Sequence, residues 1–461
     1  MNGVLGDVFK RWTRKARGSR LVRDSAWMTA HSGTRIALTA LQQLLLARIW
    51  GPKDFGTFVL ITSFVDLVVI ALDPRSQDPI VKYCSEFDAR GEKEKALALA
   101  GVGFVKNIAT AAACGLLVWA LAGWGAQTIV HWSEATPLIL LYAASYLPFS
   151  VRNAGAGVLI SRGLFRVLAL LGIAGFLFQF LLVVGVAYWG YGIKGGIYAL
   201  VASQTVSGLV IGIAGLVAAQ KAWGRWAWEG SLSSLKDRGQ EIIGFFLFND
   251  LTIVAALLFR FTDTLILGWM AGPEAAAYYR LARGFLAAAD FVNPALQSVA
   301  LPRFSTLWGK EDYQSIRLTF QRFALVTGPT LSAATAITLF LLAPYVILFV
   351  AGERYLPAVS PTRILCVALF AWISVFWLRP FLLAVGHISF WFYLMFFLSL
   401  VAIPGFFVGS QLAAVNGVAW VRSGVEVARA VIGYVRSLQL IRGFNDRAAM
   451  PIQQWGKAGV S

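Results

Sequence analysis

Long apolar stretches, separated by short charged segments, constrain this chain more than any other feature. About twelve stretches carry few charges and run for roughly 20 residues, the length that a helix needs to cross the hydrocarbon of a bilayer. Only 14% of the 461 residues are charged, too few to cover the surface of a soluble protein of this length. The chain is therefore predicted to be an all-α integral membrane protein. The predicted spans are 27–50, 55–81, 97–122, 136–158, 168–189, 194–217, 243–270, 275–302, 319–342, 361–384, 388–408 and 412–435.

The spans fall into two groups of six that repeat in the same direction. Two glycine-containing dipeptides recur 221 residues later: Gly51-Pro52 at Gly272-Pro273, and Gly196-Ile197 at Gly417-Val418. A shared offset indicates one structural unit present twice. In an apolar chain, this pattern is typical of a transporter whose two six-helix bundles surround a central cavity.

Basic residues predict the orientation. If the N-terminus is cytoplasmic, the cytoplasmic tails and loops hold 25 Lys and Arg, and the outer loops hold only Lys53, Lys194 and Arg354. Basic loops face the cytoplasm in most membrane proteins, so we expect both termini there. Anionic lipid headgroups then account for most of the net charge of +17, and nucleic acid is not expected as a partner.

This topology predicts five segments. They are a basic amphipathic N-terminus, an N-lobe with the first six spans, a cytoplasmic linker, a C-lobe with the other six, and a cytoplasmic tail. Their predicted bounds are 1–23, 24–217, 218–242, 243–436 and 437–461. The three cysteines form no paired pattern, so neither a disulfide nor a structural zinc site is expected.

Ionisable residues inside the spans are candidates for function, because a charge at the bilayer centre costs at least ~2.5–3.5 kcal/mol. Cations outnumber anions by nine to five, which predicts a cavity of positive potential suited to a diphosphate. The cations are Arg35, Lys106, Arg152, Arg260, Arg280, Arg283, Arg379, Arg422 and Arg429, and the anions are Asp66, Asp250, Asp263, Asp290 and Glu426.

Spacing narrows these candidates. Arg280 and Arg283 share one helix face, whereas Arg260 and Asp263, three residues apart, could form a structural pair. The alternating charges of Arg422, Glu426 and Arg429 indicate a structural ladder on one face of the last span. The expected contacts to a diphosphate or sugar are Arg35, Arg260, Arg280 and Arg283, followed by Arg152, Lys106 and Arg379.

Transport against a gradient needs an energy source. No GxxxxGK[ST] motif occurs, so ATP hydrolysis by this chain is not expected. No cofactor or metal is predicted either. A proton or sodium gradient remains, and Asp66, Asp263 and Asp290 are the candidate coupling carboxylates, because burial favours a carboxyl group that can gain and lose a proton.

Several segments carry a family resemblance. LLLARIWGPKDFGTFVLITSF at 44–64 and ISRGLFRVLALLGIAG at 160–175 resemble the polysaccharide-transporter family, as do FRFTDTLILGWMAGPEAAAYYRLARGF at 259–285 and NPALQSVALPRFSTL at 293–307. These are the O-antigen and exopolysaccharide flippases of the multidrug/oligosaccharidyl-lipid/polysaccharide exporter superfamily.

The resemblance implies a central cavity that opens alternately to either side of a bacterial or archaeal cytoplasmic (inner) membrane. The implied cargo is an oligosaccharide on a polyprenyl diphosphate. Membrane lipids and enzymes of polysaccharide assembly are further candidate partners. A pseudo-symmetric twelve-helix unit needs no second copy to form its path, so a monomer is expected.

Other functions remain open. A multidrug antiporter of the same superfamily would favour an acidic cavity for cationic drugs, opposite to the cation excess here. A peptidoglycan lipid-precursor flippase would normally carry two further spans. A membrane glycosyltransferase usually needs a large outer loop, and the largest one here, at about 344–360, is partly apolar. The protein is therefore not expected to be an enzyme.

Overall fold

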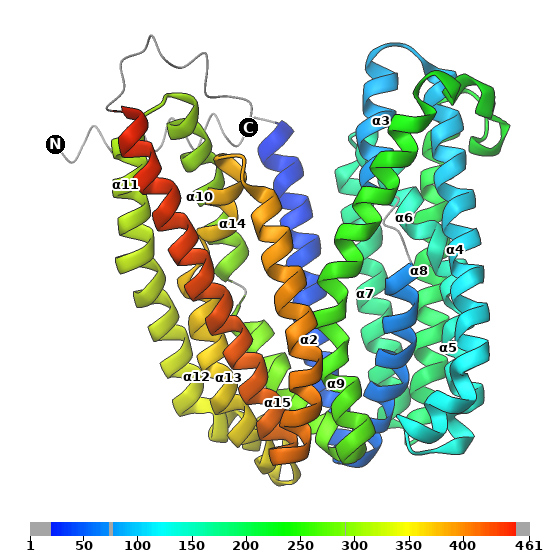
Figure 1. Ribbon diagram of the computed structural model, residues 1–461. Coiled ribbons are helices and arrows are strands. Elements are labelled where there is room, and N and C mark those ends of the chain that lie inside the picture. The colour runs from blue at the N-terminus through cyan, green and yellow to red at the C-terminus, as the bar shows by residue number, and fades with distance from the viewer. Residues whose placement is uncertain (1–19, 73–76, 291, 449–461) are drawn as a thin grey trace, which may run out of the picture. The chain divides into compact units, whose positions relative to one another are not determined.

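A computed structural model describes residues 20–72, 77–290 and 292–448. All regular secondary structure in these ranges is helical, which confirms the all-α class (Figure 1). The predicted amphipathic N-terminus and the end of the predicted tail lie largely outside the described residues. By its internal contacts, the chain divides into two units. The first includes the described residues up to Trp50 and Leu60–Leu257, and the second includes Gly51–Val59 and the described chain from Leu258 onward.

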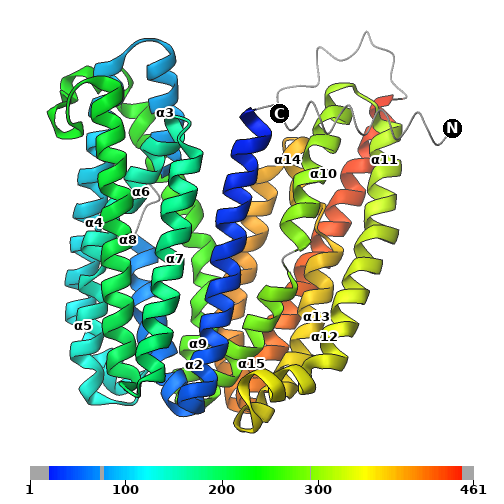
Figure 2. The ribbon, with the colours of Figure 1, turned by 180° about the vertical axis from the view of Figure 1, so that it is seen from behind.

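Within residues 20–72, 77–290 and 292–448, six helical segments are long and apolar enough to cross a membrane by length and composition. Three helices, α2, α9 and α15, contain an internal kink and are each two helices joined end to end. Figure 2 shows α6, α7 and α8 side by side in the first unit, and α12 beside α13 in the second. The helices are α2 (Arg20–Leu72), α3 (Gln77–Ala89), α4 (Lys93–Thr128), α5 (Thr136–Ala144), α6 (Tyr146–Ser161), α7 (Phe165–Tyr188), α8 (Gly192–Trp223), α9 (Gly239–Ala289), α10 (Val292–Gly309), α11 (Tyr313–Gln321), α12 (Gly328–Ala351), α13 (Val359–Ser374), α14 (Leu378–Ala384) and α15 (Ile388–Ala448).

The backbone confirms the parallel repeat. Gly51 has φ 77° and ψ 177°, and Gly272, 221 residues later, has φ 83° and ψ 178°. Four further turns with a left-handed residue recur in the second half at spacings of 220 to 223 residues. These pairs are Gly91 with Glu311, His131 with Gly352, Gly163 with Gly386, and Gly192 with Ala414.

Close approach of backbones also explains why Gly51–Val59 groups with the second unit. A Cβ atom built at Gly56 would lie 1.8 Å from the carbonyl oxygen of Pro273. Only glycine allows two chain segments to come this near. The helix after the first kink therefore packs directly on the second kink.

Small residues play the same part inside the first unit. A Cβ atom at Gly215 of α8 would lie 2.3 Å from Cα of Gly155 on α6. Lipid-embedded helices gain little hydrophobic energy from meeting each other, so close backbone packing at small residues supplies much of their attraction. The α6–α8 contact is one of these interfaces.

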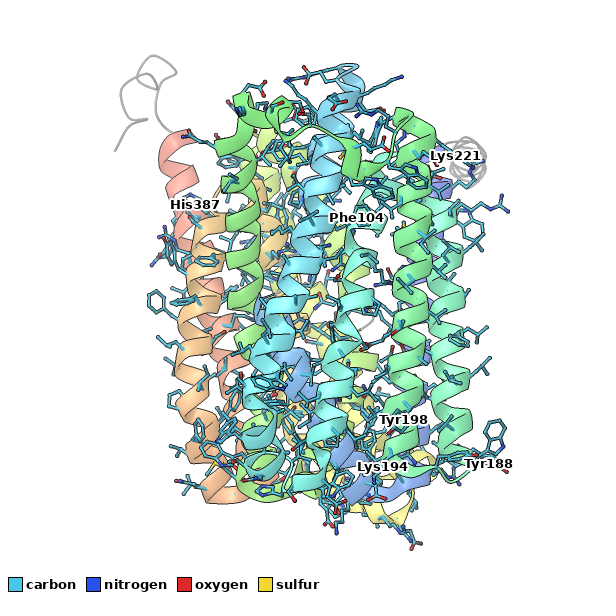
Figure 3. The ribbon with its side chains drawn as sticks, turned by 90° about the vertical axis from the view of Figure 1, so that its right-hand side faces the viewer. Phe104, Tyr188, Lys194, Tyr198, Lys221 and His387 are labelled. Carbon is cyan, nitrogen blue, oxygen red and sulfur yellow. The ribbon has the colours of Figure 1, made fainter. Side chains whose placement is uncertain are left out.

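The turn between α7 and α8 carries a group of exposed aromatic side chains. Tyr188, Trp189 and Tyr191 are 80%, 74% and 67% exposed. Figure 3 shows Tyr188 with Lys194 and Tyr198 at one end of the first unit and Lys221 at the other. Amphipathic aromatic rings concentrate where a membrane meets water, so the two ends of α8 bracket the hydrocarbon.

The segment between α8 and α9 lies against the first unit. It contains two short helices, η2 (Ala227–Glu229) and η3 (Leu232–Arg238), which pack along α4. Arg238 bonds Glu86 at 2.7 Å and Glu241 at 2.8 Å, and Lys95 bonds Asp237 at 2.7 Å. Charged groups thus fasten this segment to α3 and α4.

We expect the kink at Gly272 to require glycine for its backbone alone. Nothing lies within 4 Å of a Cβ atom built there, yet an L-residue is strained at this φ and ψ, so Gly272→Ala should cost about 1–3 kcal/mol of stability. Gly244→Ala is the matched control, because it adds the same atom to open space in the helical part of α9. Thermal unfolding in detergent measures both. Equal melting temperatures would contradict the prediction.

The segment between α8 and α9, the predicted linker, should be held less firmly to α3 and α4 in acid. Hydrogen bonds from Arg238 hold the pKa values of Glu86 and Glu241 below their ordinary value, and Lys95 does the same for the pKa of Asp237. Lowered carboxyl pKa values stabilise the attached state above about pH 4, and this stabilisation is lost as the pH falls through the lowered values. Hydrogen exchange of the linker amides, corrected for intrinsic rates, should show the loss.

Two variants test the cause. Arg238→Gln should lower amide protection at neutral pH and weaken its dependence on pH, because the pKa values of Glu86 and Glu241 are then no longer lowered by Arg238 in the attached state. Lys236→Gln, which removes a neighbouring exposed cation, should leave the pH dependence unchanged. An identical change in both variants would show that net charge rather than the specific pairs holds the linker.

Candidate functional site

A buried carboxylate lies at the centre of the second unit. Asp263 on α9 is fully buried, and its carboxylate accepts hydrogen bonds from the Tyr279 hydroxyl at 2.9 Å and from the backbone N–H of Thr264 at 2.7 Å. Arg283 donates to both of its oxygens, at 2.9 and 3.1 Å. Arg422 on α15 lies 3.7 Å away. Breaking such a buried ion pair on one side leaves an uncompensated charge, which is strongly destabilising.

The kink in α9 makes this arrangement possible. Asp263 precedes Gly272, and Arg283 follows it on the second part of the same helix. A straight helix would rise 1.5 Å per residue and hold the two side chains about 30 Å apart. Because the chain bends at Gly272, residues 20 positions apart meet in an ion pair.

A run of charges continues along α15. Glu426 faces Arg422 at 3.6 Å and Arg429 at 2.7 Å. The predicted ladder of Arg422, Glu426 and Arg429 is thus confirmed as a set of ion pairs. Together with Arg283 and Asp263 it forms a continuous chain of five groups, which we call the charge ladder.

Cavities border the charge ladder, and two of them are large enough to hold a small ligand. The first, the mixed-charge cavity, measures about 210 Å³, and the second, the arginine cavity, about 160 Å³. The mixed-charge cavity is lined by Arg283, Leu286, Ala287, Asp290, Leu365, Ala368, Leu369, Trp372, Arg422 and Glu426. The arginine cavity is lined by Asn293, Gln297, Trp372, Val375, Phe376, Arg379, Trp391 and Arg429.

The first unit contains a separate carboxylate cluster. Asp66 on α2 accepts hydrogen bonds from the hydroxyls of Tyr142 at 3.0 Å and Tyr146 at 2.6 Å. Gln204 of α8 donates to the Tyr142 hydroxyl at 3.2 Å. These tyrosines therefore orient a half-buried acid, a role that sequence reasoning did not assign to them.

The first unit also contains cations without an acidic partner among the described residues. Arg152 on α6 lies between the rings of Phe149 and Phe176, at 5.5 and 5.7 Å from their centroids. Its Nε and both ring nitrogens of His31 find no hydrogen-bond partner in the described part of the chain. Arg35 lies near enough to repel both electrostatically. We call Arg35 and Arg152 the cation cluster, and the imidazole of His31 lies beside them.

The candidate residues are thus divided. Arg283 and Asp290 line the mixed-charge cavity, and Arg379 lines the arginine cavity. Arg280 and Lys106 are half-buried, outside the lining of both cavities. The predicted pair of Arg260 with Asp263 involves a side chain outside the described ones. Among the described side chains, Asp263 pairs with Arg283 and Arg422.

The structure also refines the predicted cation excess. Arg283, Arg422 and Arg429 are offset by Asp263 and Glu426, with Asp290 in the adjoining cavity wall. Among the described residues, Arg152 in the first unit and Arg379 in the second have no acidic partner in an ion pair. His31 was missed because a single histidine in an apolar helix carries no motif.

Comparisons with known proteins agree with this fold. Residues 21–308 match the family described as "Polysaccharide biosynthesis protein". A multidrug resistance MATE family transporter of the MOP superfamily, in an inward-facing conformation, is similar in structure with a TM-score of 0.74 and 14% identity. The match covers 90% of this chain and 96% of that one. The outward-facing conformation of such a transporter gives 0.63 and 16%, covering 93% and 97%.

A third similar structure is that of a MOP superfamily transporter from Pyrococcus furiosus. It matches with a TM-score of 0.60 and 16% identity over 92% of this chain and 96% of that one. Its binding pocket is described as having reverse polarity, which suggests a different function for that protein. No curated protein matches the sequence. At these identities the structural matches show the fold of MOP superfamily transporters and no substrate.

Removing the charge of Asp263 should destabilise the second unit. Asp263→Ala leaves Arg283 buried without its acid, so we expect a loss of about 3–5 kcal/mol in the free energy of unfolding. Asp54→Ala, at an exposed position, is the matched control and should have little effect. Chemical denaturation in detergent measures both. A loss below about 1 kcal/mol for Asp263→Ala would show that the pair is not structural.

Proposed function

The chain belongs to the polysaccharide biosynthesis protein family, and on that premise we propose that it is a flippase for a lipid-linked oligosaccharide. The chain is a multi-pass membrane protein with the fold of MOP superfamily transporters. Its proposed cargo is an oligosaccharide on a polyprenyl diphosphate, moved from the cytoplasmic to the outer leaflet for surface polysaccharide synthesis such as O-antigen, exopolysaccharide or capsule. The proposed mechanism is alternating access, without enzymatic chemistry.

The cation cluster carries this proposal. Arg152 is largely enclosed by Phe149 and Phe176, and the described residues offer its Nε no hydrogen-bond acceptor. An unmatched guanidinium in an apolar bundle is costly unless a ligand supplies the opposite charge. A diphosphate does so, and the planar guanidinium matches two phosphate oxygens at once.

The second unit supports a different part of the transport cycle. Its charge ladder is internally paired, so it suits a structural core that moves as one body. Asp290, which lines the mixed-charge cavity and has an Oδ1 atom without a hydrogen-bond partner among the described residues, is the better-placed coupling carboxylate of the two candidates there. Asp263 is held by two arginines and is less free to exchange a proton or sodium ion.

The multidrug antiporter remains the alternative, because the similar structures include MATE transporters. A cationic drug would meet unfavourable repulsion at the cation cluster. The reverse polarity described for the pocket of the Pyrococcus furiosus transporter, and the different function suggested for that protein, are in line with this argument. A peptidoglycan lipid-precursor flippase is a second alternative, close to the first in chemistry.

Location and partners complete the proposal. Basic loops predict a bacterial or archaeal cytoplasmic membrane protein with both termini in the cytoplasm. The direct partners are the lipid-linked substrate and membrane lipids, with polysaccharide-assembly enzymes as further candidates. A monomer suffices, since both repeats are present in one chain.

Transbilayer movement of a fluorescent polyprenyl-diphosphate oligosaccharide in proteoliposomes tests the function. Wild type should move the lipid, and Arg152→Gln should slow movement by about tenfold or more, because one charge-assisted contact to a phosphate is lost. Lys194→Gln is the matched control, since it removes an exposed cation at the end of α8.

The outcomes separate the alternatives. Equal rates for Arg152→Gln and wild type would keep the flippase and exclude the cation cluster as its diphosphate site. Absence of lipid movement, together with export of a cationic dye, would establish the antiporter instead.

A further inference from the structure

One arginine in the second unit has unused hydrogen-bonding capacity. Arg429 on α15 is 2% exposed, and its Nη2 lies 2.7 Å from Glu426. The guanidinium carbon lies 3.7 Å from the centre of a Trp372 ring and 5.8 Å from that of Trp391. Nε and Nη1 have no hydrogen-bond partner among the described residues. A buried donor left without an acceptor is costly, so the structure provides a reason for a ligand at this place.

The arginine cavity adjoins these free donors. No carboxylate is among its described lining residues, whereas two arginines, Arg379 and Arg429, are. Gln297 donates to Oδ1 of Asn293 at 3.1 Å, so two amide side chains complete a polar wall. A water molecule occupies about 30 Å³ of liquid, so a cavity of about 160 Å³ has room for a compact ion and one or two waters.

The chemistry of the wall selects the charge and shape of the ligand. Two guanidinium groups repel any cation, and indole rings cover the faces of Arg429, which leaves its N–H edge for bonding. An N–H edge of arginine matches the spacing of oxygens on a phosphate. Trp372, Trp391 and Phe376 form the aromatic part of the same wall.

We propose that the arginine cavity binds a phosphate oxyanion, held by Arg429 and Arg379. The ligand is either free inorganic phosphate or the phosphate of a lipid carrier, and only the second source rests on the proposed flippase function. The site is distinct from the cation cluster, which lies in the first unit. It gives the second unit an anion site of its own, beside the end of the charge ladder at Arg429.

Calorimetric titration of the full-length protein tests this site. The protein is placed in nanodiscs of phosphatidylcholine in phosphate-free buffer, and inorganic phosphate or pyrophosphate is added. We expect saturable binding that Arg379→Gln weakens by about tenfold or more, because Arg379 is an exposed charged contact whose loss spares the fold. Arg436→Gln removes a cation of α15 outside the cavity lining and should bind as wild type does.

A second variant protects the test against misfolding. Arg429→Lys keeps the charge but loses the flat N–H edge, so it should weaken binding while keeping a cooperative thermal transition. Unchanged affinity in both Arg379→Gln and Arg429→Lys would overturn the proposal. So would a wild type that binds none of the three ligands, inorganic phosphate, pyrophosphate and polyprenyl diphosphate.

Parallel titrations with inorganic phosphate and with polyprenyl diphosphate distinguish the two sources of the ligand. Binding of inorganic phosphate that both variants weaken supports a free-ion site. Binding of polyprenyl diphosphate alone, with the same sensitivity, supports the lipid carrier. Lipid movement in proteoliposomes without any anion binding would overturn this inference and leave the flippase standing, whereas binding without movement would support the site and overturn the flippase.

Discussion

The requirement that a buried charge find a partner governs the interior of the second unit. Asp263 is inaccessible to water and reaches Arg283 only because the chain bends at Gly272. That bend uses a backbone conformation reserved for glycine. Arg422 then joins the carboxylate from α15, so three separate helical segments are fastened at one point. Residues of the charge ladder also line the mixed-charge cavity and the arginine cavity.

The two units solve the same problem in opposite ways. In the second unit, alternating arginines and carboxylates satisfy each other along the charge ladder. In the first unit, Asp66 is satisfied by tyrosine hydroxyls, which leaves the cations Arg35 and Arg152 without an acid in the described structure. The two units therefore share a backbone pattern but differ in how their buried charges are paired. Such asymmetry suits a transporter in which one half meets an anionic cargo and the other keeps its own charges in balance.

Several features were predictable from the sequence because they depend on local chemistry. Stretches of apolar residues long enough to span a bilayer predict helices. The recurrence of Gly51-Pro52 at Gly272-Pro273 predicted a repeated unit, and both glycines have nearly the same dihedral angles. The pairing within Arg422, Glu426 and Arg429 followed from helix periodicity alone. The attachment of the linker to α3 and α4 could not be predicted from the sequence, because its ion pairs join residues that are 152 and 142 positions apart.

The sequence by itself thus determined the class of the protein, its repeat and the set of charges placed in apolar helices. Hydropathy and turn chemistry are properties of short segments, so no tertiary information is needed to read them. Only the tertiary structure decided which charges are paired. Asp263 had Arg260 as its neighbour in sequence, yet a kinked helix and a distant one brought Arg283 and Arg422 to it. It also left Arg152 and Arg429 with free donors, because partners for a buried charge are chosen by three-dimensional packing rather than by spacing along the chain.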